Sequence, residues 1–119
     1  MRFPGFSVPA ALAAASLTAA ALAQSSLTPV NESGQIVLTI ENHVFSPAQI
    51  HVRAGQRGQI LVRNLDPMAE EFDSTSLKVE KVIAGRSEGV VRLRGLDPGS
   101  YPFAGEYHAE TAKGIVIAE

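Results

Sequence analysis

Short runs in which apolar and polar residues alternate follow one another along most of the chain. In residues 35–41, Ile36, Leu38 and Ile40 lie on one face of the run. The same alternation occurs in residues 49–53, 58–64, 89–95, 101–107 and 114–119. Period-two alternation over a few residues is typical of a strand with one buried face. Each of these runs is therefore predicted to be a β-strand.

Turn-forming residues separate the predicted strands. The stretch "DPGS" (97–100) has Pro at the second position of a turn and Gly at the third. Helical periodicity is nearly absent, and residues 74–85 are ambiguous between a short strand and an irregular crossover. Several short strands separated by turns favour an all-β fold, a β-sandwich of about seven strands.

The first 23 residues differ from the rest. One positive charge at Arg2 precedes an apolar, alanine-rich run that ends in Ala21-Leu22-Ala23. This arrangement predicts a secretory signal peptide over residues 1–23, with an uncleaved amphipathic anchor as the alternative. Residues 24–34 are polar with Pro and Gly and are predicted to be a flexible tail, so the folded domain is expected over 35–119.

Composition excludes several classes of function. The chain has 10 basic and 12 acidic residues, so loss of Arg2 with the leader leaves nine basic residues and a formal charge of −3. Without a basic run, neither nucleic acid nor an anionic membrane surface is an expected partner. The chain has no cysteine, which removes disulfides and thiolate ligands. No nucleophile-base set or Gly-rich phosphate loop supports hydrolytic or transfer chemistry.

The chain has three histidines with different surroundings. His51 lies within a predicted strand on its polar face and is interpreted as a solvated strand residue. His43 follows the first strand, where it can be a packing residue or a ligand. His108 follows a strand end and is flanked by Glu106 and Glu110. Imidazole and carboxylate together suit Fe, Cu or Zn better than Ca or Mg, so this segment is a candidate metal loop.

A second polar cluster lies in "NLDPMAEEFDS" (64–74). Its four carboxylates belong to Asp66, Glu70, Glu71 and Asp73. Carboxylates this close repel one another unless they are solvated or paired with a cation. The segment is therefore either a solvated acidic loop or part of a cation site. Met68 can be an apolar plug or a thioether ligand for Cu(I).

The stretch "YPFAGEYH" resembles the last-strand motif Y-x-F-x-C-x-x-H of cupredoxins, the small copper β-sandwiches. His108 matches the ligand histidine, and Gly105 stands at the position of the copper-binding Cys. Asn64 matches an Asn at a strand end, and Glu70 occupies the position of the family's other ligand histidine. The resemblance implies a cupredoxin-like Greek-key β-sandwich. A blue-copper site needs two His and a Cys thiolate, so that site is not expected here.

A fuller resemblance is to the EfeO-type cupredoxin-like proteins, which are small exported bacterial proteins. The shared features are "NHVFSP", "AGQ", "NLDPMAEEFDS", "EKVIAG" and "LDPGSYPFAGEYHAETAKG", and they extend over residues 35–119. The resemblance implies a periplasmic location and a link to ferrous-iron uptake. It also implies an iron permease and a periplasmic metal-binding protein as partners, with contact to the membrane only through a partner.

The cupredoxin sandwich implies that three loops meet at one end. The loops would bring together the predicted metal ligands His43, Glu70, Glu71, Glu106 and His108. Two imidazoles with one or two carboxylates can hold a copper or iron ion and leave a position open. Neighbouring polar groups, Asn42 or Asp73, would orient the ligands.

Three functions follow as hypotheses. The first is a periplasmic cupredoxin-like protein that binds Fe or Cu and assists iron uptake, with support of Fe(II) oxidation as one role. The second is a copper-dependent ferroxidase, so enzymatic activity is left open. The third is a structural or docking module without a working metal site.

Overall fold

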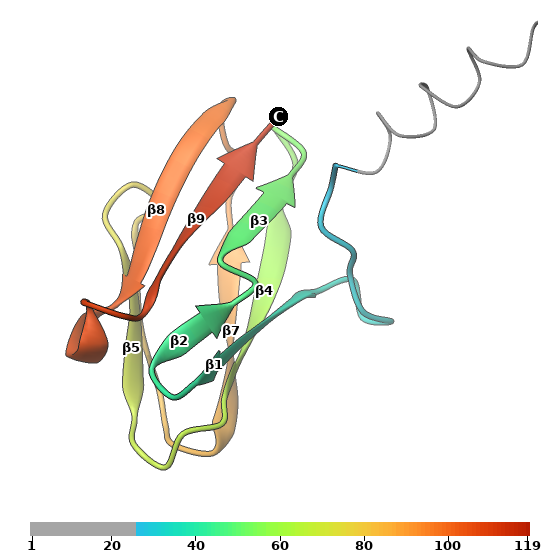
Figure 1. The fold of residues 1–119 in the computed structure, drawn as a ribbon. Coiled ribbons are helices and arrows are strands. Elements are labelled where there is room, and N and C mark those ends of the chain that lie inside the picture. The colour runs from blue at the N-terminus through green and yellow to red at the C-terminus, as the bar shows by residue number, and fades with distance from the viewer. Residues whose placement is uncertain (1–25) are drawn as a thin grey trace, which may run out of the picture.

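The computed structural model describes residues 26–119, which form two β-sheets packed face to face (Figure 1). The predicted signal peptide lies outside the described residues. Within residues 26–119, no helix has both the length and the apolar character needed to cross a membrane. The predicted all-β sandwich is confirmed.

The first sheet has four strands in the order β2-β1-β4-β7. The parallel pair β1 and β4 lies at its centre, while β2 and β7 pair antiparallel at its edges. The bounds are Ile36–Glu41 for β1, Val44–Ser46 for β2, Gly58–Asn64 for β4 and Ser87–Leu93 for β7.

The second sheet has five strands in the order β3-β9-β8-β5-β6. Its bounds are Gln49–Val52 for β3, Glu70–Ser74 for β5, Val79–Ile83 for β6, Gly99–Gly105 for β8 and Lys113–Ala118 for β9. A single turn of 3₁₀ helix, η1 (Glu106–His108), connects β8 to β9. Since β1 and β2 belong to one sheet and β8 and β9 to the other, the connections at one end can meet across the sandwich.

The core fills the space between the sheets with apolar side chains from both. Its centre holds three phenylalanines, and Phe72 stacks on Phe103 with ring centroids 4.9 Å apart. Phe45 meets both rings edge-on, at 5.3 Å from Phe103 and 6.1 Å from Phe72. Aromatic pairs at such distances contribute beyond the area that they bury. This cluster ties β2 of one sheet to β5 and β8 of the other.

Residues 26–119 contain nine strands where about seven were expected. The six alternating runs are all strands, and β6 lies in the ambiguous segment 74–85. The interpretation of residues 64–74 as a loop was wrong for their second half, which forms β5. This strand was hidden because a carboxylate, Glu70, occupies one of its buried positions. The expected strand 101–107 ends early, at Gly105, where the 3₁₀ turn begins.

Candidate metal centre

His43 lies in the tight turn that joins β1 to β2. Glu41 pairs with Val44, so Asn42 and His43 are the two central residues, with φ of 53° and 61°. Positive φ at both positions is the backbone of a type I′ hairpin turn, which Asn-Gly fits best. Imidazole thus occupies a position where glycine is conformationally preferred. The turn projects the ring from the end of the sandwich.

Asp66 holds this turn from the loop that follows β4. Its two carboxylate oxygens accept the backbone N–H groups of Asn42 and His43, at 2.7 and 3.0 Å. Asp66 is only 8% exposed. Burial alone would raise the pKa of Asp66. The hydrogen bonds from the backbone of His43 and Asn42 act in the opposite direction, as do the nearby charges of His43 and His108. The net result is a pKa below the ordinary value of 3.8. The carboxylate therefore stays ionised and fixes the turn.

Asn64, at the end of β4, sets the position of the Asp66 loop. Its side chain is fully buried, and its amide donates to the carbonyl oxygens of Met68 and Ile83, at 2.8 and 3.2 Å. Its carbonyl oxygen accepts the N–H of Asp66 at 3.0 Å. These bonds satisfy the buried amide and shape the loop between β4 and β5. The role of Asn64 here is therefore to position the backbone of the loop.

His108 ends the 3₁₀ turn and is held by Glu70 from β5. Its Nδ1 lies 2.6 Å from Oε2 of Glu70, whose side chain is only 4% exposed. The other oxygen, Oε1, accepts the N–H groups of Tyr107 at 2.9 Å and Glu71 at 3.1 Å. A buried carboxylate needs such partners, because burial without them is strongly unfavourable. Glu70 is thereby satisfied on both oxygens.

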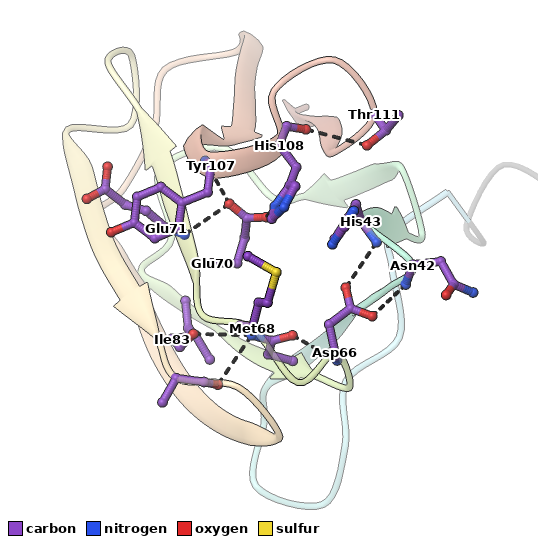
Figure 2. Close-up of polar contacts among 12 residues, drawn as sticks. Asn42, His43, Asp66, Met68, Glu70, Glu71, Ile83, Tyr107, His108 and Thr111 are labelled. Carbon is purple, nitrogen blue, oxygen red and sulfur yellow. Dashed lines mark hydrogen bonds and ion pairs between the residues drawn. The ribbon is translucent and has the colours of Figure 1, made fainter.

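The two imidazoles of this end lie against each other. The rings of His43 and His108 are stacked, with centroids 3.5 Å apart and planes 9° from parallel. Figure 2 shows Glu70 beside His108 on the side away from His43, and Asp66 below the turn that carries His43. Residues 65 positions apart in sequence, from connections of different sheets, thus come into contact.

Gly105 lies where the cupredoxin motif has its cysteine, and no side chain fits there. A Cβ atom on Gly105 would lie 2.7 Å from Cδ of Glu70 and 2.8 Å from Cβ of Ala112. Such distances are shorter than real carbon contacts, so both Glu70 and Ala112 would have to move. The carboxylate of Glu70 therefore fills the space that a residue at position 105 would need.

The five predicted ligands do not all meet. The structure brings together His43, Glu70 and His108, whereas Glu71 and Glu106 lie on the outer surface of the second sheet. The pKa of Glu71 is raised there by loss of hydration and by nearby negative charges. These charges belong to Glu80, Asp73, Glu106 and Glu70. Within residues 26–119, no three His, Asp or Glu side chains gather in an arrangement that could hold a metal ion.

The orienting groups also differ from the expected ones. Asp73 lies on the outer face of β5, and Asn42 contributes only its backbone N–H. Glu70 and Asp66 hold the two histidines instead. His51 lies on β3, where its Nδ1 is 2.7 Å from a carboxylate oxygen of Glu119, so it does not join the site. The match of Glu70 to a ligand position was a sequence signal for its inward direction.

A cupredoxin-like domain profile matches residues 10–118, and the chain therefore belongs to the cupredoxin-like domain family. One similar protein is the uncharacterized protein RP394 of Rickettsia prowazekii, 31% identical over 83 residues. That match covers 70% of this chain and 66% of the relative, just under two thirds of its length.

Solved structures share the fold at low sequence identity. The metal-binding domain of the Cu(I)-exporting ATPase CopA of Streptococcus pneumoniae has a TM-score of 0.65 at 20% identity, covering 79% of this chain and 99% of that one. Auracyanin A, a blue copper protein of Chloroflexus aurantiacus, has a TM-score of 0.61 at 13% identity, with coverage of 71% and 98%. A reduced amicyanin variant has a TM-score of 0.58 at 18% identity, with coverage of 76% and 86%.

The donor groups at this end of the sandwich exclude a blue-copper site but suit a copper ion held by imidazoles. A blue-copper centre requires a thiolate, and here Glu70 fills the space next to Gly105 in a chain without cysteine. Imidazole nitrogen is nonetheless a good copper ligand, and two imidazoles lie against each other at this end of the sandwich. His43 and His108 would hold the ion, with Glu70 behind one of them.

Proposed function

We propose that the protein binds a copper ion through the imidazoles of His43 and His108. The observation that carries the proposal is the contact between these two rings, one of which rests on a buried carboxylate. Metal-binding histidines commonly donate the N–H of one ring nitrogen to a carboxylate and bind the ion through the other. The pair of His108 and Glu70 has this arrangement.

The turn that carries His43 supports the same proposal. A non-glycine residue with φ of 61° is conformationally unfavourable by roughly 1–2 kcal/mol, and unfavourable backbone is typical of functional positions. Asp66 compensates by binding both N–H groups of the turn. The backbone is thus held in a conformation whose effect is to place this imidazole beside His108.

Met68 supplies a further donor for the reduced ion. Its side chain is 57% exposed, and in Figure 2 it extends from the loop after β4 toward Glu70. A thioether is a soft ligand that favours Cu(I), whereas imidazole accepts both oxidation states. The site would therefore hold Cu(I) more tightly than imidazoles alone would.

The cellular role that we propose is copper-dependent assistance of ferrous-iron uptake in the periplasm. Its support is the resemblance to EfeO-type proteins and the predicted signal peptide over residues 1–23. An iron permease and a second periplasmic metal-binding protein would be the partners. The ferroxidase and the docking module without a metal site are the alternative outcomes of the experiments below.

Metal titration of residues 24–119 tests the proposal. Calorimetry with Cu(II), a competing chromophoric chelator with Cu(I), and Fe(II) under anaerobic conditions would each give an affinity. Copper is expected to bind more tightly than roughly 100 μM, and His43→Gly and His108→Ala should each weaken it by at least tenfold. Glycine is chosen at position 43 because it fits the turn without strain.

The third histidine provides the matched control. His51→Ala removes an imidazole from β3 and should leave the copper affinity unchanged. Equal loss in all three variants would contradict the proposed site. Absence of copper binding by the unmodified protein would favour the docking module, and tighter binding of Fe(II) than of copper would overturn the choice of metal.

A further inference from the structure

We propose that Glu70 is the positioning residue that decides which nitrogen of His108 is free to bind an ion. The inference rests on the proposed copper site and concerns how that site is prepared. Nδ1 of His108 lies 2.6 Å from Oε2 of Glu70. A carboxylate only accepts hydrogen bonds, so in the neutral ring Nδ1 carries the hydrogen and Nε2 carries the lone pair.

The backbone prevents Glu70 from exchanging the roles of its oxygens. Oε1 already accepts the N–H groups of Tyr107 and Glu71, which leaves only Oε2 for the imidazole. Both N–H groups are donors that cannot change role, because they belong to the main chain. The carboxylate is therefore held in one orientation, and His108 is held in one tautomer.

Replacement of Glu70 by glutamine reverses the tautomer according to this geometry. The glutamine oxygen must stay at the Oε1 position, because two backbone N–H groups point at it. Its amide nitrogen then lies beside Nδ1 of His108 as a donor. Nδ1 must become the acceptor, so the hydrogen moves to Nε2 and blocks that nitrogen. Glu70→Gln changes neither the size nor the packing of the side chain.

Gly105 contributes to the same positioning of the Glu70 carboxylate. A Cβ atom at this position would lie 2.7 Å from Cδ and 2.9 Å from Oε1 of Glu70. The same Cβ atom would lie 2.8 Å from Cβ of Ala112. Gly105→Ala should therefore shift Glu70 away from His108 and press on Ala112 as well, while every donor group of the site remains in the chain. The glycine at the cysteine position of the cupredoxin motif thus leaves the space that Glu70 and Ala112 occupy.

Nuclear magnetic resonance of the metal-free protein tests the inference directly. Long-range ¹⁵N–¹H spectra identify the protonated ring nitrogen at a pH where the imidazole is neutral. The unmodified protein is expected to show His108 with hydrogen on Nδ1, and Glu70→Gln should show it on Nε2. Glu110→Gln, a change at an exposed residue of the next turn, should leave the tautomer unaltered.

Copper affinity provides the second readout. Loss of a group that orients a ligating histidine typically weakens metal binding by 10–100-fold, and both Glu70→Gln and Gly105→Ala should show a loss of this size. Gly58→Ala, where a Cβ meets nothing within 4 Å, is the control for the glycine change.

The two readouts separate this inference from the proposed function. Hydrogen on Nε2 in the unmodified protein, or an unchanged tautomer in Glu70→Gln, would overturn the positioning role. An unmodified protein that shows the expected tautomer but binds no copper would contradict the proposed function alone. A Glu70→Gln variant with a reversed tautomer and full copper affinity would also overturn the positioning role. Copper binding would then not depend on a free lone pair at Nε2 of His108.

Discussion

Each histidine of the site is held by a carboxylate, but the two carboxylates bind different parts of the residue. Glu70 contacts the ring of His108 directly, whereas Asp66 binds the backbone of His43 and leaves its ring free. His43 and His108 therefore differ in freedom, since one ring is fixed by a hydrogen bond and the other mainly by its turn and by stacking. The lone pairs of the ring nitrogens lie in the ring planes, and the stacked rings present their faces to each other, so the ring of His43 would have to turn for both to bind one ion.

Asp66→Asn is expected to destabilise the protein. One of the two N–H groups of the turn would face an amide donor in place of an oxygen, and a buried bond to a charged group contributes about 1.5–3 kcal/mol. The pKa of Asp66 is lowered by folding, so its ionised form stabilises the fold above the ordinary value of 3.8. This stabilisation is lost as the pH falls through the lower pKa of the folded state.

Urea denaturation at pH 7 and at pH 3 measures this effect. The difference in the free energy of unfolding between the unmodified protein and Asp66→Asn should be largest at pH 7 and should shrink at pH 3. Asp97→Asn, a change at an exposed turn residue, is the control and should have little effect at either pH. A difference that does not depend on pH would contradict the role of the charge.

At the scale of elements, strand β5 presents different chemistry on its two faces. Glu70, Phe72 and Ser74 point into the sandwich, while Glu71 and Asp73 point outward. The inward carboxylate has three hydrogen-bond partners. The outward ones face like charges, because Asp73 pairs directly with Glu80 on β6. Like charges opposite each other across two strands are destabilising.

Glu71→Gln is expected to stabilise the protein at neutral pH. Loss of hydration and the surrounding carboxylates raise the pKa of Glu71 in the folded state, so its charge opposes folding above that pKa. The gain in the free energy of unfolding should be present at pH 7 and low salt. It should decrease at high salt, which screens exposed charges, and vanish at pH 3, where the carboxyl is protonated in both states. Urea denaturation under these three conditions measures it, and a gain insensitive to salt would count against repulsion.

The contact between β8 and β9 predicts a different effect at Gly114. Phe103 pairs directly with Gly114, and a Cβ atom there would collide with the Phe103 ring and lie 2.9 Å from the carbonyl oxygen of Ala48. Gly114→Ala should therefore destabilise by about 1–3 kcal/mol through overpacking. Gly58→Ala has open space around it and should change stability much less. Equal effects of the two changes in thermal denaturation would contradict the close contact.

At the scale of the whole molecule, the candidate site joins the two sheets. His43 comes from the turn between β1 and β2 of the first sheet, and His108 from the connection between β8 and β9 of the second. The phenylalanine cluster makes a similar connection in the core beneath them. An ion bound to both imidazoles would link the sheets in a chain that has no disulfide to do so.

Copper is therefore expected to stabilise the folded protein. Binding to the native state alone raises the free energy of unfolding by about 2.7 kcal/mol when free copper is at 100 times its Kd. Thermal denaturation with and without copper measures the rise. His51→Ala should retain the rise, and His43→Gly should reduce it to about half or less at the same free copper concentration. A rise of equal size in His43→Gly would place the bound copper elsewhere.

Much of the fold was predictable from local pattern, and the exceptions have a physical cause. Alternation identified six strands because their inward residues are apolar, as in Ile36, Leu38 and Ile40. Strand β5 was missed because its inward Glu70 and Ser74 are polar. Their burial depends on partners that are distant in the chain, such as His108 and the carbonyl oxygen of Pro102. No local pattern contains those partners.

The sequence by itself determined the sandwich, the family motifs and the absence of a blue-copper thiolate, because these depend on residue type and spacing. It also placed Glu70 and Glu71 on opposite faces of any strand that contains them. Only the tertiary structure decided that Glu70 faces His108, that Glu71 and Glu106 remain outside, and that His43 stacks on His108. The reason is that residues 43, 70 and 108 come together only when the two sheets pack against each other.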